Sequence, residues 1–192
     1  MAHPIEYLKK IFKLSPERIE LVSTMIVEKH MPKGSFIERS NQVIETYYIK
    51  KGAARAFYTK DGKEHTIAFA FEDEYLLTKG FAGNKPVQIT ITFLEDTKII
   101  YIPSSRLKEA LDNIKTEKSP EAILFFHAGL QQYLTYLEER LYVFQSMSAR
   151  ERYEWVINRY PRLLEYATLT QIASYLGLTK ETLYRIRSGK YQ

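Results

Sequence analysis

The stretch TLTQIASYLGLTKETLYRIR, residues 168–187, is the most informative part of the sequence. Gly177 allows a left-handed turn after a first helix, and Ala173 is small where two helices would approach closely. Thr179 is a good cap for a second helix. The apolar residues that would pack between the two helices are Ile172, Leu176, Leu178, Leu183 and Ile186. This pattern predicts a helix-turn-helix.

The second helix of this motif would present a basic, polar face to solvent. Such a face is typical of a recognition helix that enters the major groove of DNA. A helical hairpin with a purely structural role is the alternative interpretation. The residues predicted to contact DNA are Thr179, Lys180, Glu181, Tyr184, Arg185, Arg187 and Lys190.

The distribution of charge agrees with a polyanionic partner for this end of the chain. The 192 residues carry a net charge of +5, and residues 148–192 contain eight cationic and four anionic side chains. Most of the excess positive charge therefore lies in the last quarter. A basic terminal segment favours nucleic acid only weakly by itself, because a solvated helix often carries a small surplus.

Upstream of this segment, Ser119-Pro120-Glu121 supplies a cap, a proline and an acid that together predict the start of a long helix. Apolar residues then recur at alternating spacings of four and three, which is a heptad pattern. The pattern predicts a dimerisation helix, although a single amphipathic helix docked on its own domain would show it too. The seam consists of Ile123, His127, Leu130, Leu134, Leu137, Leu141 and Phe144.

The first half of the chain is rich in short β-type segments. Strands are predicted at residues 47–49, 53–58, 66–71, 88–93 and 98–102, and Asp61-Gly62 is a strong hairpin signal. Helical periodicity predicts two short helices within residues 4–28, one at 104–113, and three more at 149–159, 170–176 and 180–188. We therefore expect an α+β protein with an N-terminal β-roll, a long helix and a C-terminal helix-turn-helix.

This order of elements resembles the Crp/Fnr family of bacterial transcription regulators over essentially the whole chain. The most specific match is QIASYLGLTKETLYR, residues 171–185. The resemblance implies an effector-binding β-roll in residues 1–118, similar to a cyclic nucleotide-binding domain, a dimerisation helix in 119–147 and a DNA-binding domain in 148–192. It also implies that Lys180, Glu181 and Arg185 face base edges in double-stranded DNA. The implied partners are DNA, a second copy of the chain, a small-molecule effector and RNA polymerase.

The ligand cassette of the family is less well matched. Cyclic-nucleotide binders use an arginine for the phosphate, and residues 74–92 contain none. The sequence therefore predicts weak or absent cAMP binding, and the effector is not identified. Lys79 and Lys85 would take the place of this arginine only if their side chains bound the phosphate and were not simply solvated. The aromatic residues of the roll have two possible roles. They could bind a more apolar effector, or they could be ordinary core residues. The candidate pocket residues are Phe69, Phe71, Lys79, Phe81, Lys85 and Gln88.

Several function classes find no support in the sequence. The chain has no cysteine, and its four histidines show no metal spacing, so we expect no thiolate metal site, no cofactor and no catalytic residues. No apolar stretch is long enough for a membrane helix, and we expect a cytoplasmic protein that is not an enzyme. The competing function is a ligand-binding β-roll without DNA-binding activity, whose C-terminal helices bind another protein.

Overall fold

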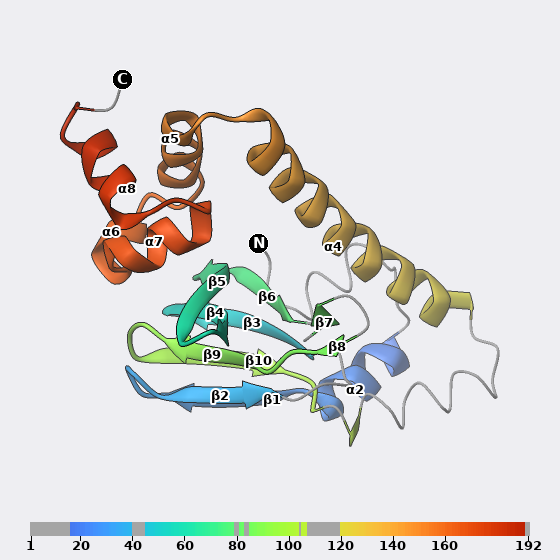
Figure 1. The fold of residues 1–192 in the computed structure, drawn as a ribbon. Helices are drawn as coiled ribbons and strands as arrows, with labels where there is room; N and C mark the ends of the chain where they lie inside the picture. Colours follow the sequence, from blue (N-terminus) through green and yellow to red (C-terminus); the bar gives the residue numbers. More distant parts are fainter. Residues whose placement is uncertain are drawn as a thin grey trace.

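A computed structural model describes residues 16–39, 45–78, 81–82, 85–103, 105–106 and 120–190, and the structural statements below concern these residues. Figure 1 shows strands packed into a roll, a long helix that runs along it, and a compact group of helices at the C-terminal end. The fold class predicted from the sequence, α+β with an N-terminal roll followed by helices, is confirmed.

The roll contains one helix and ten strands in the described residues. Their bounds are α2 Pro16–Met25, β1 Val27–Met31, β2 Phe36–Arg39, β3 Glu45–Lys51, β4 Ala53–Lys60, β5 Lys63–Phe71, β6 Glu74–Thr78, β7 Phe81–Ala82, β8 Lys85–Pro86, β9 Ile89–Phe93 and β10 Thr97–Tyr101. The helices after the roll are α4 Pro120–Ser146, α5 Ala149–Arg159, α6 Leu163–Tyr166, α7 Leu169–Leu176 and α8 Lys180–Arg187.

Two antiparallel four-stranded sheets form the body of the roll. Their strand orders are β1-β10-β3-β6 and β2-β9-β4-β5, so β5 is an edge strand. Strands β4 and β5 form the hairpin expected at Asp61-Gly62. Inward-facing side chains of the two sheets build an apolar core, which includes Tyr47, Ile49, Leu76, Ile91 and Phe93.

The structure corrects the sequence prediction at the start of the roll. The helix predicted to reach Glu28 ends at Met25, and residues 27–31 form β1 instead. Strand β1 pairs with β10, from Val27 opposite Tyr101 to Met31 opposite Thr97. This pairing joins residues about seventy positions apart, and such tertiary contacts override local helical periodicity. Strands β2 and β6 and the short helix α6 were also not predicted.

Some predictions fall where the structure describes no residues. The first of the two N-terminal helices, most of the helix expected at 104–113 and the domain boundary expected at residue 118 lie outside the described residues. The long helix α4 and the helices α5, α7 and α8 agree with the predicted segments to within a few residues.

A second apolar cluster joins the roll to the C-terminal helices. It combines Phe69 of β5 with buried residues of α5, α6, α7 and α8, and Phe71 and Leu94 of the roll pack against it. The C-terminal helices are thus packed on the outer face of the sheet that ends in β5. Helix α7 lies next to the strands, and α8 lies on the far side of α7 (Figure 1).

Candidate nucleic-acid interface and its attachment to the roll

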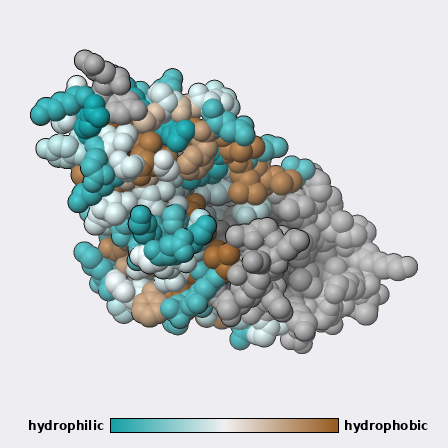
Figure 2. Space-filling model, viewed as in Figure 1, coloured by the Kyte–Doolittle hydropathy of each residue, from teal (hydrophilic) through white to brown (hydrophobic). Residues whose placement is uncertain are grey.

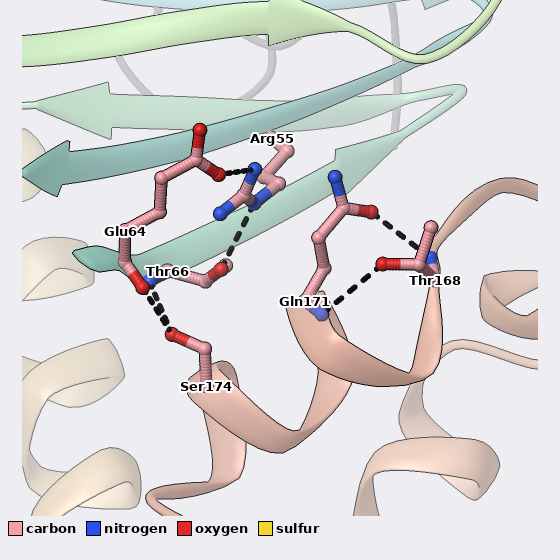
Figure 3. Close-up of polar contacts among 6 residues, drawn as sticks. All are labelled: Arg55, Glu64, Thr66, Thr168, Gln171 and Ser174. Atoms are coloured by element: carbon pink, nitrogen blue, oxygen red, sulfur yellow. Dashed lines mark hydrogen bonds and ion pairs between the residues drawn. The ribbon is translucent and has the colours of Figure 1, made fainter. Parts of the chain in front are cut away.

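Helix α7 begins with a reciprocal capping box. The Thr168 hydroxyl accepts a hydrogen bond from the Gln171 amide (3.3 Å), and the Gln171 side chain accepts one from the Thr168 amide (2.9 Å; Figure 3). The helix ends at Gly177, whose φ of 65° is left-handed, and the Leu178 amide donates back to the Ala173 carbonyl (2.9 Å). These local bonds explain why this segment folds as the sequence predicts.

Helix α8 follows α7 after three residues and is capped by Thr179, whose hydroxyl accepts a hydrogen bond from the Thr182 amide (3.0 Å). Leu183 and Ile186 are buried and hold α8 on the other helices. All seven residues predicted to contact DNA are exposed on α8 or at its ends, namely Thr179, Lys180, Glu181, Tyr184, Arg185, Arg187 and Lys190. The structure therefore brings them together on one side of the protein, away from the roll (Figure 1).

Other basic residues of the C-terminal segment have structural roles. The Arg152 guanidinium donates to the carbonyls of Phe144 (2.7 Å), Met147 (3.0 Å) and Leu176 (3.3 Å), which lie at the ends of α4 and α7. Arg159 forms an ion pair with Glu74 of the roll at 2.7 Å. The basic residues that were predicted to contact DNA are exposed on and around α8.

Helix α7 packs against the edge strand β5, and the side chain of Ser174 hydrogen-bonds to the backbone of that strand. The Ser174 hydroxyl accepts a hydrogen bond from the Thr66 amide (2.9 Å) and donates one to the Glu64 carbonyl (3.0 Å), as Figure 3 shows. An edge strand exposes backbone donors and acceptors that would otherwise need water or another strand. Here one side chain of the helix-turn-helix satisfies a donor and an acceptor of β5.

A buried arginine supports the same part of β5 from the neighbouring strand. Arg55 of β4 is 2% exposed, and its guanidinium donates to the Thr66 hydroxyl (2.9 Å) and the Glu64 carboxylate (2.7 Å; Figure 3). Burial lowers the pKa of Arg55, while the Glu64 carboxylate raises it and so opposes that effect. The two residues that Ser174 contacts through their backbones are thus held through their side chains by Arg55.

Aromatic rings complete the contact between α7 and the roll. The Tyr175 ring is fully buried and meets the edge of Phe69 at a centroid distance of 5.2 Å. The Arg140 guanidinium of α4 lies 3.8 Å from the centroid of the same ring and donates to the Tyr175 carbonyl (2.7 Å). Desolvation of the Tyr175 hydroxyl raises its pKa well above the ordinary value. This position therefore joins the roll, α4 and α7.

The candidate effector pocket is not assembled as the sequence suggested. Phe69 packs into the cluster with the C-terminal helices, and Phe71 meets the rings of Tyr160 and Tyr166 there, so neither ring lines the interior of the roll. The reason is strand alternation, because Ala68 and Ala70 of β5 occupy the inward positions. Gln88 is exposed. Lys79 and the side chains of Phe81 and Lys85 lie outside the described residues.

Helix α4 has two different faces. One face packs on the protein itself: the Tyr136 hydroxyl donates to the Ile67 carbonyl of β5 (2.9 Å), Arg140 contacts Tyr175, and Val143 is buried. Three leucines of the predicted seam lie beside this docked face on the helix surface. These residues, Leu134, Leu137 and Leu141, are exposed. Figure 2 shows hydrophobic residues gathered at the surface along this part of α4.

The remaining residues of the predicted seam are placed differently. Phe144 lies against the turn of the helix-turn-helix, and the guanidinium groups of Arg140 and Arg152 lie 4.6 Å and 5.3 Å from its ring centroid. Ile123, His127 and Leu130 are in α4, but their side chains lie outside the described residues. The structure thus describes the exposure of Leu134, Leu137, Leu141 and Phe144 within the seam.

Sequence reasoning did not assign a role to Arg55, Ser174 or Arg140. A signal existed for Arg55, because a charged residue among Ala53, Ala54, Ala56 and Phe57 of a strand needs a partner. No comparable signal existed for Ser174 and Arg140, whose partners come from β5 and α7 respectively.

Two other kinds of site find no support in this part of the chain. Among the described residues, no group of three or more histidines and carboxylates is placed to hold a metal ion. No described helix is both long and apolar enough to cross a membrane.

The left-handed backbone of Gly177 and its contact with α4 together predict that glycine is favoured at this turn. A Cβ atom at Gly177 would lie 2.6 Å from Cε1 of Phe144, and the left-handed φ adds backbone strain. We expect Gly177→Ala to lower the free energy of unfolding by about 2–4 kcal/mol in chemical denaturation.

Gly189→Ala is the matched control, because its φ is 70° but no atom lies within 4 Å of the added Cβ. It should show only the backbone cost of about 1–2 kcal/mol. Equal losses for the two variants would mean that Phe144 does not restrict the turn.

Comparisons with known proteins agree with this architecture. The profile of the cyclic nucleotide-binding domain family matches residues 28–113. No curated protein sequence matches the chain. FixK2 from Bradyrhizobium japonicum is 21% identical, with a TM-score of 0.63, and the alignment covers 85% of this chain and 83% of that one.

Two further solved structures align over nearly the whole chain. A transcriptional regulator of the Crp/Fnr family from Eubacterium rectale is 17% identical with a TM-score of 0.66, covering 97% of this chain and 86% of its own. The c-di-GMP-responsive global regulator CLP of Xanthomonas campestris is 15% identical with a TM-score of 0.61, covering 91% of both chains. Residues 28–113 thus match the profile of the cyclic nucleotide-binding domain family, and the chain as a whole has the same fold as these solved structures.

Proposed function

We propose that this protein is a DNA-binding transcription regulator of the Crp/Fnr type. The observation that carries the proposal is the exposed, basic face of α8, which stands on a capped helix-turn-helix and points away from the roll. A recognition helix needs this arrangement, because its N-terminal residues must reach base edges without obstruction. The proposal includes no catalytic activity, and it places the protein in the cytoplasm with the DNA that it reads.

Individual residues of α8 have distinct roles in this proposal. Glu181 lies in the first turn of α8, and Arg185 lies one turn further along the same exposed side. A carboxylate can accept from cytosine N4, and an arginine can donate two hydrogen bonds to guanine. Lys190 lies beyond the end of α8, where a phosphate contact is the natural role.

The exposed leucines of α4 support a dimer. Because the docked face of α4 uses Tyr136, Arg140 and Val143, packing within one chain does not account for Leu134, Leu137 and Leu141. We propose that a second copy of the chain covers them in a two-fold symmetric coiled coil. Two recognition helices would then read an inverted repeat with half-sites about 34 Å apart.

The proposed effector site lies inside the roll, but its ligand stays unidentified. Residues 74–92 contain no arginine, and the buried Arg55 alternates in β4 with the inward-facing Ala54 and Ala56. Arg55 is therefore turned towards Glu64 and Thr66 and not towards the core of the roll. RNA polymerase, which the family resemblance implied as a partner, also stays an expectation.

The first prediction of this proposal concerns base readout. Arg185→Ala should weaken binding to the preferred operator by about 1–3 kcal/mol and relax its sequence preference, because a base contact discriminates between sequences. Fluorescence anisotropy on specific and random duplexes measures both effects. Equal losses on the two duplexes would contradict a base-reading role.

A matched prediction concerns a phosphate contact. Lys190→Ala should weaken binding to all sequences alike and should lower the slope of log affinity against log salt by about one. If the wild-type protein binds no duplex at all, with or without candidate effectors, the competing function as a protein-binding module is favoured.

The third prediction tests the dimer. Replacing Leu134 and Leu137 by Asp should yield monomers in sedimentation experiments and should abolish high-affinity operator binding, since buried unpaired charges are costly. Leu164→Asp is the control, because Leu164 is 42% exposed, compared with 43% for Leu134, but lies on α6 away from the seam. A monomeric wild-type protein at micromolar concentration would refute the heptad interpretation.

The fourth prediction is that cAMP binds weakly or not at all. Its phosphate would carry a charge into the roll without the arginine that normally pairs with it. Titration calorimetry with cAMP should detect no binding in the sub-micromolar range, and a sub-micromolar dissociation constant would overturn the prediction.

A further inference from the structure

The position of the recognition helix depends on α7. The turn at Gly177, the cap at Thr179 and the shared core of Ile172 and Leu183 join α7 and α8 into one unit. Any contact that holds α7 in place therefore also holds α8.

Helix α7 is anchored at two places. Its C-terminal end is tied to α4, because Arg140 donates to the Tyr175 carbonyl (2.7 Å) and Arg152 to the Leu176 carbonyl (3.3 Å). Its middle is tied to the roll by Ser174, which contacts the backbone of Glu64 and Thr66. Ser174 adds two directional hydrogen bonds to the apolar contact of Phe69 with Tyr175 and to the ion pair of Arg159 with Glu74, so it contributes to a fixed orientation of these helices.

The serine contact also sets a register along β5. Outward-pointing backbone groups of an edge strand recur at every second residue, and residues 64 and 66 supply such groups to Ser174. The next equivalent position along the strand is two residues away, about 6.8 Å. The apolar contact between Phe69 and Tyr175 is not directional and would tolerate smaller shifts.

We propose that Ser174 is a positioning residue that sets the spacing between the two half-sites of the operator, by fixing the register of the helix-turn-helix on the edge of the roll. The inference rests on the proposed function as a dimeric DNA-binding regulator. Tyr136 connects β5 to α4 through its hydrogen bond to Ile67, so the exposed leucines, β5, α7 and α8 form one continuous path. Arg55 keeps Glu64 and Thr66 in place along this path.

The test compares operators whose half-sites are moved apart or together by two base pairs. The operator is first selected from a random pool with the wild-type protein, and affinities are then measured by anisotropy. The wild-type protein should lose at least roughly tenfold in affinity when the spacing changes, because a rigid dimer cannot engage both half-sites. Ser174→Ala should lose about threefold or less, while its affinity for a single half-site stays within about twofold of wild type.

Ser23→Ala is the matched control for the serine. The Ser23 hydroxyl donates to the Ile19 carbonyl within α2 (2.7 Å) and makes no contact with α7, so spacing preference should be unchanged. Phe69→Ala, which removes the apolar part of the same contact, should also relax the spacing preference. Its control is Phe36→Ala, because Phe36 lies on β2 at the opposite edge of the sheet and is 61% exposed, compared with 4% for Phe69.

Hydrogen exchange reports on the contact without DNA. In Ser174→Ala, the amides of residues 63–71 should exchange faster than in the wild-type protein, because the Thr66 amide loses its acceptor. Unchanged exchange, or a spacing preference in Ser174→Ala equal to that of the wild type, would overturn the inference and leave the proposed function standing. Failure of the wild-type protein to bind any duplex would overturn the proposed function and the inference with it.

Discussion

Strand β5 is the edge of its sheet, and the hydroxyl of Ser174 on α7 satisfies one outward amide and one outward carbonyl of that edge. The interaction removes an open edge from the roll and at the same time joins the roll to the helix-turn-helix. Two hydrogen bonds of about 1 kcal/mol each would not hold two domains together. The burial of Phe69 and Tyr175 beside them supplies the apolar area, and the serine supplies the direction.

The basic residues of the chain divide into two groups with different environments. Arg55, Arg140 and Arg152 donate to carbonyls, hydroxyls or carboxylates within the protein, and the rings of Phe57, Phe144 and Tyr175 lie under their guanidinium groups. A planar guanidinium suits such sites because it can stack on a ring and donate several hydrogen bonds at once. The cations on and after α8 are exposed at the surface. Net charge therefore understates how strongly positive charge is concentrated at the candidate DNA-binding surface.

Helix α4 has two different adjacent faces, one docked on the protein and one exposed. Tyr136, Arg140 and Val143 recur at spacings of four and three and contact or face the protein's own roll and helices. Leu134, Leu137 and Leu141 repeat at similar spacings but are displaced by one or two residues around the helix axis. The spacing of four and three residues that suggested one seam in the sequence is thus the spacing of one of two adjacent rows of side chains on α4. A helix that is fixed to the roll on one row can present the other to a second chain without rearrangement.

Local residue patterns in the sequence determined the elements that are stabilised by near neighbours. The cap at Thr179, the left-handed Gly177 and the Asp61-Gly62 hairpin all act within a few residues, and each is found where the sequence placed it. Only the tertiary structure decided which partners distant residues would have. It converted residues 27–31 from helix to strand by pairing them with β10, and it turned Phe69 and Phe71 away from the core of the roll towards the C-terminal helices. Strand alternation predicts that neighbouring side chains face opposite ways, but it does not say which face meets the core. That choice, and the meeting of Ser174 with β5 more than a hundred residues earlier, depend on packing between distant segments, for which a single sequence contains no local signal.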